Sequence, residues 1–409
     1  MPDTFVIAGA GQTAAQAVDS LRRAGFGGRL LVVGEEPCLP YQRPPLSKKF
    51  LGGELAVERL ALKPLSFYEQ ARAELRLGVR IEGLDLARRE VSLSDGERVL
   101  YDRLLLATGA APRKIAVPGT ELAGIHYLRT VSDVERIRAE LASARDVVIV
   151  GGGYIGLEAA ATCRGLGSEV DVVEMADRVM NRVVAPEVSA FFTAEHARAG
   201  VRIHTRTLVS GFRARPREPG HVAVVETLDG REFPADIVII GIGVVPVTDV
   251  AAAAGLACQD GIAVDEHCRT SDPSVYAAGD CASHPSPRYG RRVRLESVDN
   301  AFEQAKTAAA NMAGGSVVHD RVPWFWSDQF DLKLLIVGLN FDYDQVVLRG
   351  RPQARSFACC YLRAGELLAL DCINDAKDYM AAKKVIAERH RCDPARLADP
   401  AVALKDTVL

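Results

Sequence analysis

The stretch DVVIVGGGYIGLEAAATCRGLGSEVDVVEMADR, residues 146–178, decides the fold of this chain. A β-branched run leads into three glycines, an alanine-rich segment, a second β-branched run and then an acidic residue. This order is typical of a βαβ unit, in which a helix joins two neighbouring parallel strands. We therefore expect a parallel sheet here, with the glycine-rich turn between its first strand and the helix.

A second segment with the same plan opens the chain. It is TFVIAGAGQTAAQAVDSLRRAGFGGRLLVVGEE, residues 4–36. Asp-Gly pairs at 95–96 and 229–230 lie between strand-like runs and predict one hairpin after each βαβ unit. The repetition predicts an α/β fold with two Rossmann-like dinucleotide-binding domains.

The composition changes from about residue 320 onward. Strand-like runs such as VPWFWSDQFDLKLLIVGL precede one predicted helix at 375–390, with Asp375 as its cap. We expect a C-terminal α+β domain there. The Pro- and Arg-rich stretch 213–221 is expected to be a surface loop.

The first glycine pattern is G-x-G-x-x-A, formed by Gly9, Gly11 and Ala14. Gly9 permits the tight turn, Gly11 lets the backbone approach a pyrophosphate, and Ala14 keeps the helix close to the strand. Glu35 ends the second strand, where a carboxylate accepts hydrogen bonds from ribose hydroxyls. These residues predict a dinucleotide site.

The second pattern is the full G-x-G-x-x-G of Gly151, Gly153 and Gly156, with Glu174 in the position equivalent to Glu35. A carboxylate there repels a 2′-phosphate, and Met175 and Ala176 follow it, so the pattern favours NAD over NADP. Arg178 weakens that preference slightly. A tight turn explains either pattern taken singly, whereas two patterns with acidic residues in register indicate two dinucleotides.

Composition excludes several classes of protein. The chain has 409 residues, enough for two or three domains, with 48% hydrophobic and 25% charged residues and a net charge of -3. That charge gives no overall attraction to nucleic acid or to an anionic membrane. The N-terminus lacks the pattern of a signal peptide, and no apolar run has the length of a membrane span. We expect a cytoplasmic protein.

Two dinucleotides in one chain need different roles. The pairing that makes chemical sense is a tightly held flavin dinucleotide and a visiting nicotinamide, because hydride then passes directly between their rings. Such an enzyme depends on positioning more than on an acid or a base.

An ordered set of motifs indicates a family. GAGQTA, YQRPPLSK, ATGAAPR, GGGYIGLE, GIGVVP, YAAGDCA, ESVDNA and PWFWSDQ follow one another along the chain. With them the chain resembles the two-dinucleotide-domain flavoprotein reductases throughout its length. Within these it looks most like the NADH-dependent ferredoxin reductases of the putidaredoxin reductase type, which also serve aromatic-ring dioxygenases. The resemblance implies an FAD domain at 1–113 and 245–320, an NAD domain at 114–244, and a C-terminal domain at 321–409 that covers the flavin.

The resemblance also implies roles for residues in the matching motifs. Those expected to bind FAD are Gly9, Gly11, Ala14, Glu35, Arg43, Lys48, Thr108, Gly109, Arg113, Gly279, Asp280, Val298 and Trp326. Those expected to meet NADH are Gly151, Gly153, Tyr154, Ile155, Gly156, Glu158, Glu174 and Gly243. Lys48 and Glu158, which we expect to pair near the reactive flavin nitrogen, are the predicted catalytic residues.

Some of these residues also have simpler explanations. Asp280 fits a cap of a following helix, and Glu158 fits a solvated charge that suits the helix dipole. Trp324 and Trp326, which alternate along one strand, fit core aromatics.

The nine cysteines bear on the electron acceptor. No pair is spaced C-x-x-C or C-x-x-x-x-C, so the sequence predicts neither a disulfide reductase nor a zinc site, and we expect no bound metal. Cys38 lies near the place where thiol-dependent NADH oxidases keep one cysteine, but it comes before YQRPPLSK and looks too early. The electrons of the flavin must then leave one at a time.

The resemblance implies a 2Fe–2S ferredoxin as the acceptor, serving a cytochrome-type monooxygenase or a Rieske oxygenase. Such redox complexes are transient and steered by charge, so a basic patch is expected. The candidates are Arg291, Arg292, Arg294, Lys383 and Lys384, each of which also fits a solvated charged surface. The alternatives are an NADH oxidase or quinone reductase, and a redox-signalling flavoprotein like apoptosis-inducing factor. The nucleic-acid role of the latter calls for a basic surface that this chain lacks.

Overall fold

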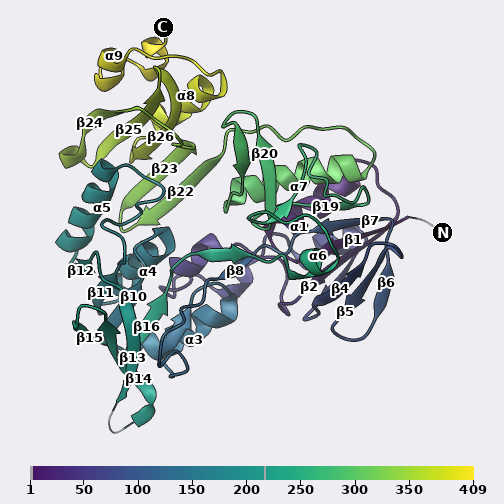
Figure 1. The fold of residues 1–409 in the computed structure, drawn as a ribbon, viewed down its shortest axis with the longest axis horizontal. Coiled ribbons are helices and arrows are strands. Elements are labelled where there is room, and N and C mark those ends of the chain that lie inside the picture. The colour runs from purple at the N-terminus through teal and green to yellow at the C-terminus, as the bar shows by residue number, and fades with distance from the viewer. Residues whose placement is uncertain (1–2, 216–217) are drawn as a thin grey trace. The chain divides into compact units, whose positions relative to one another are not determined.

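The computed structural model describes residues 3–215 and 218–409 (Figure 1). The chain forms two compact units, each built from separate segments. Unit 1 contains Met1–Gln42, Glu58–Ala111 and Val245–Arg321, and unit 2 contains Arg43–Val57, Pro112–Val244 and Val322–Leu409. The chain changes unit inside β8 (Ala110–Pro112) and again inside β17 (Val244–Pro246). The assignment of three domains by function stays a prediction.

Unit 1 contains a five-stranded parallel sheet in the order β19-β7-β1-β2-β3. Its strands are β1 (Thr4–Ala8), β2 (Arg29–Gly34), β3 (Ala73–Leu77), β7 (Arg103–Leu106) and β19 (Val275–Ala277). The helix of the first βαβ unit is α1 (Gln12–Arg23), and it packs beside α7 (Val298–Met312). The βαβ unit predicted at 4–36 is therefore confirmed.

Alternation along β1 explains how this sheet is covered on both faces. Phe5 and Ile7 pack with the alanine-rich sides of α1 and α7. Val6 and Ala8 point the other way, into a core that also takes in the antiparallel meander of β4 (Ile81–Asp85), β5 (Glu90–Leu93) and β6 (Arg98–Leu100). A strand that is apolar on both faces is what a buried parallel sheet requires.

Unit 2 contains the second parallel sheet, in the order β12-β11-β10-β16-β9. Its strands are β9 (Ile125–Tyr127), β10 (Asp146–Val150), β11 (Glu169–Val173), β12 (Val201–His204) and β16 (Ile237–Ile240). Its helices are α3 (Val131–Leu141), α4 (Tyr154–Gly165) and α5 (Pro186–Arg198). This confirms the βαβ unit predicted at 146–178.

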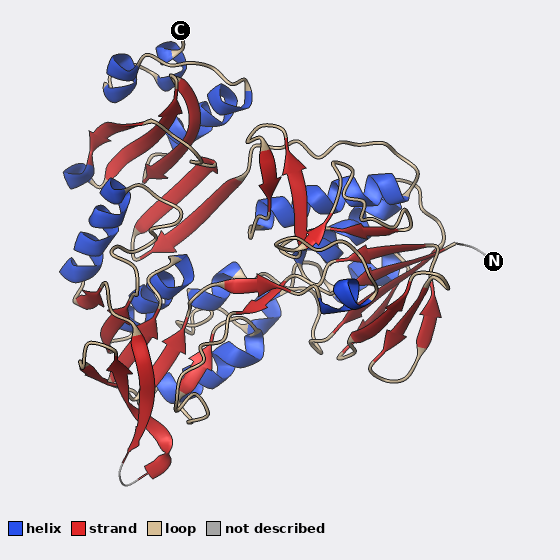
Figure 2. Cartoon of the chain, viewed as in Figure 1, coloured by secondary structure: helices blue, strands red, loops and turns tan. Residues whose placement is uncertain are grey.

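The C-terminal part of unit 2 is an antiparallel sheet with one long helix against it (Figure 2). The order is β22-β23-β26-β25-β24, with β22 (Trp324–Gln329), β23 (Leu332–Gly338), β24 (Gln345–Arg351), β25 (Ser356–Arg363) and β26 (Glu366–Ile373). The helix α8 (Ala376–Ala387) is capped by Asp375, whose side chain accepts a hydrogen bond from Asp378 N, as predicted. The predicted α+β class of this part is confirmed.

Shorter elements complete the two units. They are α2 (Leu65–Gln70), α6 (Asp249–Ala253), β18 (Ile262–Ala263), β20 (Ala282–Ser286) and β21 (Arg291–Val293) in unit 1, and the 3-10 helix η1 (Pro44–Ser47) and α9 (Pro394–Ala398) in unit 2. Unit 2 also has a small antiparallel sheet of β13 (Val209–Arg215), β14 (Glu218–Thr227) and β15 (Glu232–Pro234).

The hairpins predicted at Asp95-Gly96 and Asp229-Gly230 are both present, between β5 and β6 and between β14 and β15. The prediction of a surface loop at 213–221 was wrong at both ends of the range, because β13 runs to Arg215 and β14 begins at Glu218. Residues 216–217 lie outside the described part of the chain. Pairing between the two strands satisfies backbone groups that a loop would leave to solvent.

Candidate functional site

The glycine-rich turn of unit 1 lies where β1 ends and α1 begins. Gly9 has a φ of 119°, and a Cβ on it would lie 2.1 Å from the carbonyl oxygen of Ala107, so only glycine fits. Gly11 is the N-cap of α1, makes no side-chain cap and faces open space. Ala14 is fully buried against the sheet. The turn therefore leaves amides at a helix N-terminus available to an anion, which fits the pyrophosphate of a dinucleotide.

The turn of unit 2 repeats this geometry. Gly151 has a φ of 109°, and a Cβ on it would lie 2.5 Å from Gly241 O. Gly153 is the uncapped N-terminal residue before α4 and faces open space. Gly156 touches the backbone of Gly151, where a Cβ would be only 2.0 Å from its oxygen. This site also has the shape that a dinucleotide requires.

The two acidic residues differ in their surroundings. Glu174 follows β11, and its carboxylate accepts hydrogen bonds from Gly152 N at 2.6 Å and Ala176 N at 2.7 Å. It is thereby fixed against the glycine-rich turn. Glu35 follows β2 with its side chain 70% exposed, 3.3 Å from Arg80 Nη1. Its place at the strand end is as predicted, but the structure holds it less firmly.

Arg178, the residue that weakened the preference for NAD, is occupied within its own segment. Its Nη1 donates to Val184 O at 2.8 Å and to Ser189 Oγ at 2.7 Å, and its Nη2 donates to Asn181 O at 2.7 Å. Because both terminal nitrogens are used on these acceptors, Arg178 is poorly placed to recognise a 2′-phosphate.

The predicted catalytic pair is formed. Lys48 Nζ lies 2.7 Å from Glu158 Oε2, and the hydroxyls of Ser47 and Ser327 donate to the same carboxylate at 2.5 and 2.7 Å. Glu158 is 5% exposed, which excludes a solvated helix charge. A carboxylate this deeply buried needs the cation and both hydroxyls to replace its hydration. Lys48 itself ends the rigid Pro-Pro turn, directly after η1.

The other predicted residues of YQRPPLSK and GGGYIGLE fall in several environments. Arg43 Nη1 donates to Arg129 O at 2.6 Å. Ile155, in the first turn of α4, is 40% exposed. The hydroxyl of Tyr154 is buried and finds no hydrogen-bond partner in the part of the chain that the structure describes. Tyr154 and Glu158 are one helical turn apart on α4.

Four of the residues expected to bind FAD lie at strand ends of unit 1. Thr108 Oγ1 donates to Val247 O at 2.6 Å, and Gly109 follows it with a φ of 69°. Gly279 N donates to the buried amide oxygen of Gln304 at 2.8 Å. Asp280 is followed by strand β20, so its alternative role as the cap of a following helix is wrong. The sequence reading missed Gln304, which holds the Gly279 backbone.

The remaining predicted residues lie at helix and strand ends. Val298 is the first residue of α7, whose cap is Ser297. Arg113 N donates to Gly243 O at 2.9 Å, and Gly243 has a φ of 98°. Trp324 and Trp326 share one face of β22, with ring centroids 5.6 Å apart, as predicted. Trp324 packs on the core of the C-terminal sheet, whereas Trp326 is half-buried outside that core.

Comparison with known proteins assigns these parts to a family. The model of the pyridine nucleotide-disulphide oxidoreductases matches residues 3–305. The chain belongs to the pyridine nucleotide-disulphide oxidoreductase family. A second model, the reductase C-terminal domain, matches residues 324–408. The predicted oxidoreductase activity and the predicted FAD and pyridine-nucleotide cofactors are those of this family and are confirmed.

Three relatives match this family member along nearly its whole length. The ferredoxin reductase subunit of the 5,5'-dehydrodivanillate O-demethylase from Sphingobium sp. is 43% identical over 98% of this chain and 97% of its own. Putidaredoxin reductase CamA from Pseudomonas putida is 40% identical over 99% and 97%. The crystal structure of the ferredoxin reductase for the CYP199A2 system of Rhodopseudomonas palustris has a TM-score of 0.95, 41% identity and full coverage of both chains. The predicted resemblance is therefore confirmed.

Most cysteines of this member are buried. All nine lie within the described residues, and seven are buried: Cys163, Cys268, Cys281, Cys359, Cys360, Cys372 and Cys392. Burial raises the pKa of Cys163 to about 12, which keeps its thiol protonated and unreactive. Cys359 and Cys360 point to opposite faces of β25 and serve packing. No disulfide links the described cysteines.

Two arginines of the basic patch predicted to contact the partner are engaged within unit 1 instead. Arg294 has a side chain only 11% exposed and pairs with Asp260 at 3.1 Å and Glu296 at 2.7 Å. Arg292 donates to the backbone carbonyls of Val264 and Ser283, and burial lowers its pKa. Both arginines support unit 1, so their prediction as presented charges was wrong. Lys384, with a side chain 79% exposed, and Lys383, 4.8 Å from the ring of Trp324, remain candidates in unit 2.

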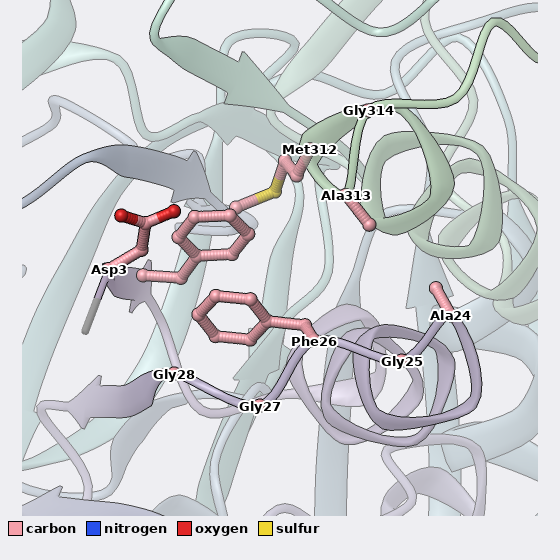
Figure 3. A pocket seen from close by; sticks show the side chains of 10 residues that line it. Asp3, Ala24, Gly25, Phe26, Gly27, Gly28, Met312, Ala313 and Gly314 are labelled. Atoms are coloured by element: carbon pink, nitrogen blue, oxygen red, sulfur yellow. The ribbon is translucent and has the colours of Figure 1, made fainter.

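A shallow hollow of about 450 Å³ in unit 1 is not a dinucleotide site (Figure 3). Phe26 and its neighbouring glycines line it after the end of α1, and Met312 lines it at the end of α7. Helix carboxyl ends carry partial negative charge, and Asp3 adds a carboxylate. That polarity repels phosphate, and the hollow lies at the opposite end of α1 from its glycine-rich turn.

Two further findings concern metal sites and membrane-spanning helices, neither of which the sequence predicts. Within residues 3–215 and 218–409, no group of three or more His, Cys, Asp or Glu side chains is arranged to hold a metal ion. In the same residues, no helix combines the length and the apolar character that crossing a bilayer requires. The cytoplasmic location stays a prediction.

A carboxyl group in the C-terminal sheet titrates far from its ordinary range. Burial raises the pKa of Asp371, which is 1% exposed, to about 7, although a hydrogen bond from Tyr361 acts in the opposite direction. The ionisable groups that interact with it are Tyr361, Cys359 and Cys360 on β25 and Tyr154 on α4, and Tyr154 also interacts with Glu158, the partner of Lys48.

The raised pKa of Asp371 predicts a pH dependence of stability. An unfolded Asp has a pKa of about 4, so the stabilisation from this protonated group is complete below about pH 4 and is lost as pH rises through about 7. We expect Asp371→Asn to raise the melting temperature at pH 8 by about 5 °C relative to the parent chain, and to leave it nearly unchanged at pH 4. Melting curves from pH 4 to 8 measure this. An equal shift at every pH would contradict the assignment.

Proposed function

We propose that this chain is an NADH:ferredoxin reductase, which takes hydride from NADH onto FAD and passes single electrons to a 2Fe–2S ferredoxin. The observation that carries the proposal is the match of about 40% identity, along nearly the whole chain, to reductases that are named for such partners. A solved structure of the covalent putidaredoxin reductase–putidaredoxin complex is also similar, with a TM-score of 0.95 and 40% identity over 99% of this chain. The oxygenase served is a cytochrome-type monooxygenase or a Rieske oxygenase.

The proposed roles of the residues follow their environments. Residues 1–113 and 245–320 bind FAD through Gly9, Gly11, Ala14, Glu35, Arg43, Thr108, Gly109, Arg113, Gly279, Asp280 and Val298. Residues 114–244 bind NADH through Gly151, Gly153, Gly156, Glu174 and Gly243, and Trp326 of the C-terminal part contacts FAD. The flavin, when bound, accepts hydride and releases electrons singly. Lys48 supplies a cation paired with Glu158, whose carboxylate also accepts hydrogen bonds from Ser47 and Ser327.

Reduction by NADH followed by electron transfer to candidate acceptors tests the proposal. The flavin is reduced anaerobically with NADH in a stopped-flow instrument and mixed with a 2Fe–2S ferredoxin and cytochrome c. We expect rapid cytochrome c reduction only when ferredoxin is present. Equal rates without ferredoxin, or rapid oxygen consumption, would instead indicate an NADH oxidase or quinone reductase. A rubredoxin arm is included because a rubredoxin-NAD(+) reductase from Pseudomonas putida is 37% identical over 90% of this chain.

Basic side chains are the proposed contacts of the ferredoxin, considered separately on each unit. Lys383 and Lys384 in α8 and Arg291 in β21 are the remaining cations of the predicted patch. Ferredoxins of this type are acidic, so opposite charges would steer the encounter. Raising the ionic strength is expected to slow electron transfer to ferredoxin and to leave reduction by NADH unchanged.

We further propose that NADH is preferred over NADPH, because Glu174 meets the adenosine ribose and Arg178 is occupied elsewhere. The double change Glu174→Ala and Met175→Arg is expected to raise the ratio of kcat/KM for NADPH to that for NADH by about tenfold, which corresponds to about 1.4 kcal/mol. Steady-state kinetics with both nucleotides measure this ratio. Met175→Arg is the matched control, since it adds the cation and keeps the carboxylate. An unchanged ratio in the double variant would contradict the preference.

A further inference from the structure

The C-terminal sheet has a buried polar pair on the face opposite α8. Asp371 on β26 pairs in register with Cys359 on β25, and Tyr361 lies two residues further along β25, so both side chains share one face. Cys360 and Cys372 point the other way, into the core with α8. Asp371 is 1% exposed and Tyr361 is fully buried, and the two are joined by a hydrogen bond between the Tyr361 hydroxyl and Asp371 Oδ2.

Tyr361 makes a second hydrogen bond, to the backbone of a segment that precedes α5. Ala185 N donates to the Tyr361 hydroxyl oxygen at 2.7 Å, just before α5 begins at Pro186. Asn340 Nδ2 donates to Val183 O at 3.2 Å in the same segment. The C-terminal part of unit 2 therefore holds one end of the segment Val179–Ala185.

The other end of this segment lies against the glycine-rich turn of unit 2. Met180 N donates to Gly152 O at 2.9 Å. The Arg182 guanidinium comes within 3.5 Å of the point where a Cβ on Gly243 would lie. Gly152 follows β10 and Gly243 follows β16, so the segment runs along the carboxyl edge of the parallel sheet, where ligands of such sheets bind.

The backbone of the segment contains one residue in an unfavourable conformation. Met180 has a φ of 50°, a left-handed conformation that a residue other than glycine keeps only when its surroundings enforce it. One of the two hydrogen bonds is donated by Met180 N itself, to Gly152 O, and the other by Ala185 N further along the segment. Losing the one at Ala185 would remove the contact closest to α5 and leave this part of the segment held by the bonds that Asn340 and Arg178 donate to Val183 O and Val184 O.

We propose that Tyr361 and Asp371 are positioning residues for the pyridine nucleotide, acting by holding the segment Val179–Ala185 against the glycine-rich turn. This rests on the proposed binding of NADH at Gly151–Gly156. Asp371 sets the direction of the hydroxyl: because the Tyr361 oxygen already accepts from Ala185 N, its proton needs another acceptor, and Asp371 supplies it. A side chain of the C-terminal domain thereby contributes to nucleotide affinity without touching the nucleotide.

The test compares three variants of the FAD-loaded protein. Tyr361→Phe removes the hydroxyl and leaves Ala185 N and Asp371 without their partner. Tyr343→Phe is the matched control, because the Tyr343 ring lies 5.2 Å from that of Tyr361 and its side chain is 37% exposed. The double variant Tyr361→Phe and Asp371→Leu removes both side-chain polar groups, so the carboxylate is no longer left unpaired and only Ala185 N lacks its partner.

Two measurements are made on each variant. Calorimetric titration with NAD⁺ gives the dissociation constant, and NADH oxidation with ferricyanide as the acceptor gives KM and kcat independently of ferredoxin. Loss of one hydrogen bond corresponds to about a fivefold change in affinity. For Tyr361→Phe we expect about that increase in the NAD⁺ dissociation constant and in KM for NADH, with kcat and FAD content unchanged. Tyr343→Phe should match the parent chain.

The double variant separates positioning from stability. We expect it to melt above Tyr361→Phe and still to bind NAD⁺ about fivefold more weakly, because the carboxylate is gone but Ala185 N has not regained its acceptor. If Tyr361→Phe proves too unstable to purify, the double variant alone tests whether the Tyr361 hydroxyl contributes to NAD⁺ affinity. Parent-like NAD⁺ affinity in the double variant would overturn the proposal. If the parent chain itself bound no NAD⁺, the proposed function would be wrong instead.

Discussion

Lys48→Met is expected to slow reduction of the flavin by NADH by about 100-fold or more, in the range that loss of one preorganised charge costs other enzymes. Lys48 is the cation that pairs with a buried carboxylate, because its Nζ lies 2.7 Å from Glu158 Oε2. Met fills a similar volume but leaves Glu158 with two hydroxyl donors and no positive charge. The carboxylate must then bind a proton or remain uncompensated, and either outcome changes the charge at the proposed flavin edge.

Stopped-flow absorbance of the flavin under anaerobic conditions measures this rate. Lys49→Met is the matched control, because Lys49 is the next residue along and is exposed. It should react as the parent chain does. A Lys48→Met rate within threefold of the parent, with full FAD content, would remove Lys48 from the catalytic pair.

Arg349→Met is expected to destabilise the chain by about 3–5 kcal/mol, the usual cost of leaving a buried charge unpaired, and to lower the melting temperature by about 5 °C. The Arg349 side chain is 3% exposed and forms an ion pair with Asp378. Its remaining donors reach the carbonyls of Leu397, Asp399 and Val402 at 2.7–3.1 Å. The Arg349 guanidinium therefore links β24 to α8 and to the residues at and just after the end of α9.

Thermal unfolding followed by circular dichroism measures this loss. Arg351→Met is the matched control, because Arg351 is two residues along the same strand and exposed. We expect it to shift the melting temperature by no more than about 2 °C, as is usual for surface changes. Equal shifts for the two variants would show that Arg349 contributes only as a surface charge does.

The parts that could be predicted from the sequence depend on short-range patterns. A βαβ unit with its glycine-rich turn lies within about thirty residues, so its strands, helix and uncapped amides are all encoded locally. The same holds for the Asp-Gly hairpins and the Asp375 cap. Gly9 and Gly151 were therefore placed correctly, with the backbone contacts that require glycine.

The parts that could not be predicted depend on distant partners. Glu158 meets Ser47 across 111 residues and Ser327 across 169, and no local pattern indicates those contacts. Arg292 and Arg294 were predicted to be surface cations because runs of charged residues usually lie on the surface. Their hydrogen-bond and ion-pair partners come from distant parts of the chain, so only the folded unit shows that these side chains are engaged. Asp371 did leave a signal, since it interrupts the apolar strand ELLALDCI, where a carboxylate needs a partner.

The interrupted sequence of unit 1 has a consequence for synthesis on the ribosome. Strand β7 forms its outer pairing with β19, in which Leu104 faces Val275, about 170 residues later. At ~5–20 residues per second the edge of β7 stays open for roughly 10–30 s, while the whole parallel sheet of unit 2 emerges. An unpaired apolar edge invites association between nascent chains. Slow translation of residues 112–244 should therefore lower the yield of folded protein, and chaperones that cover strand edges should restore it.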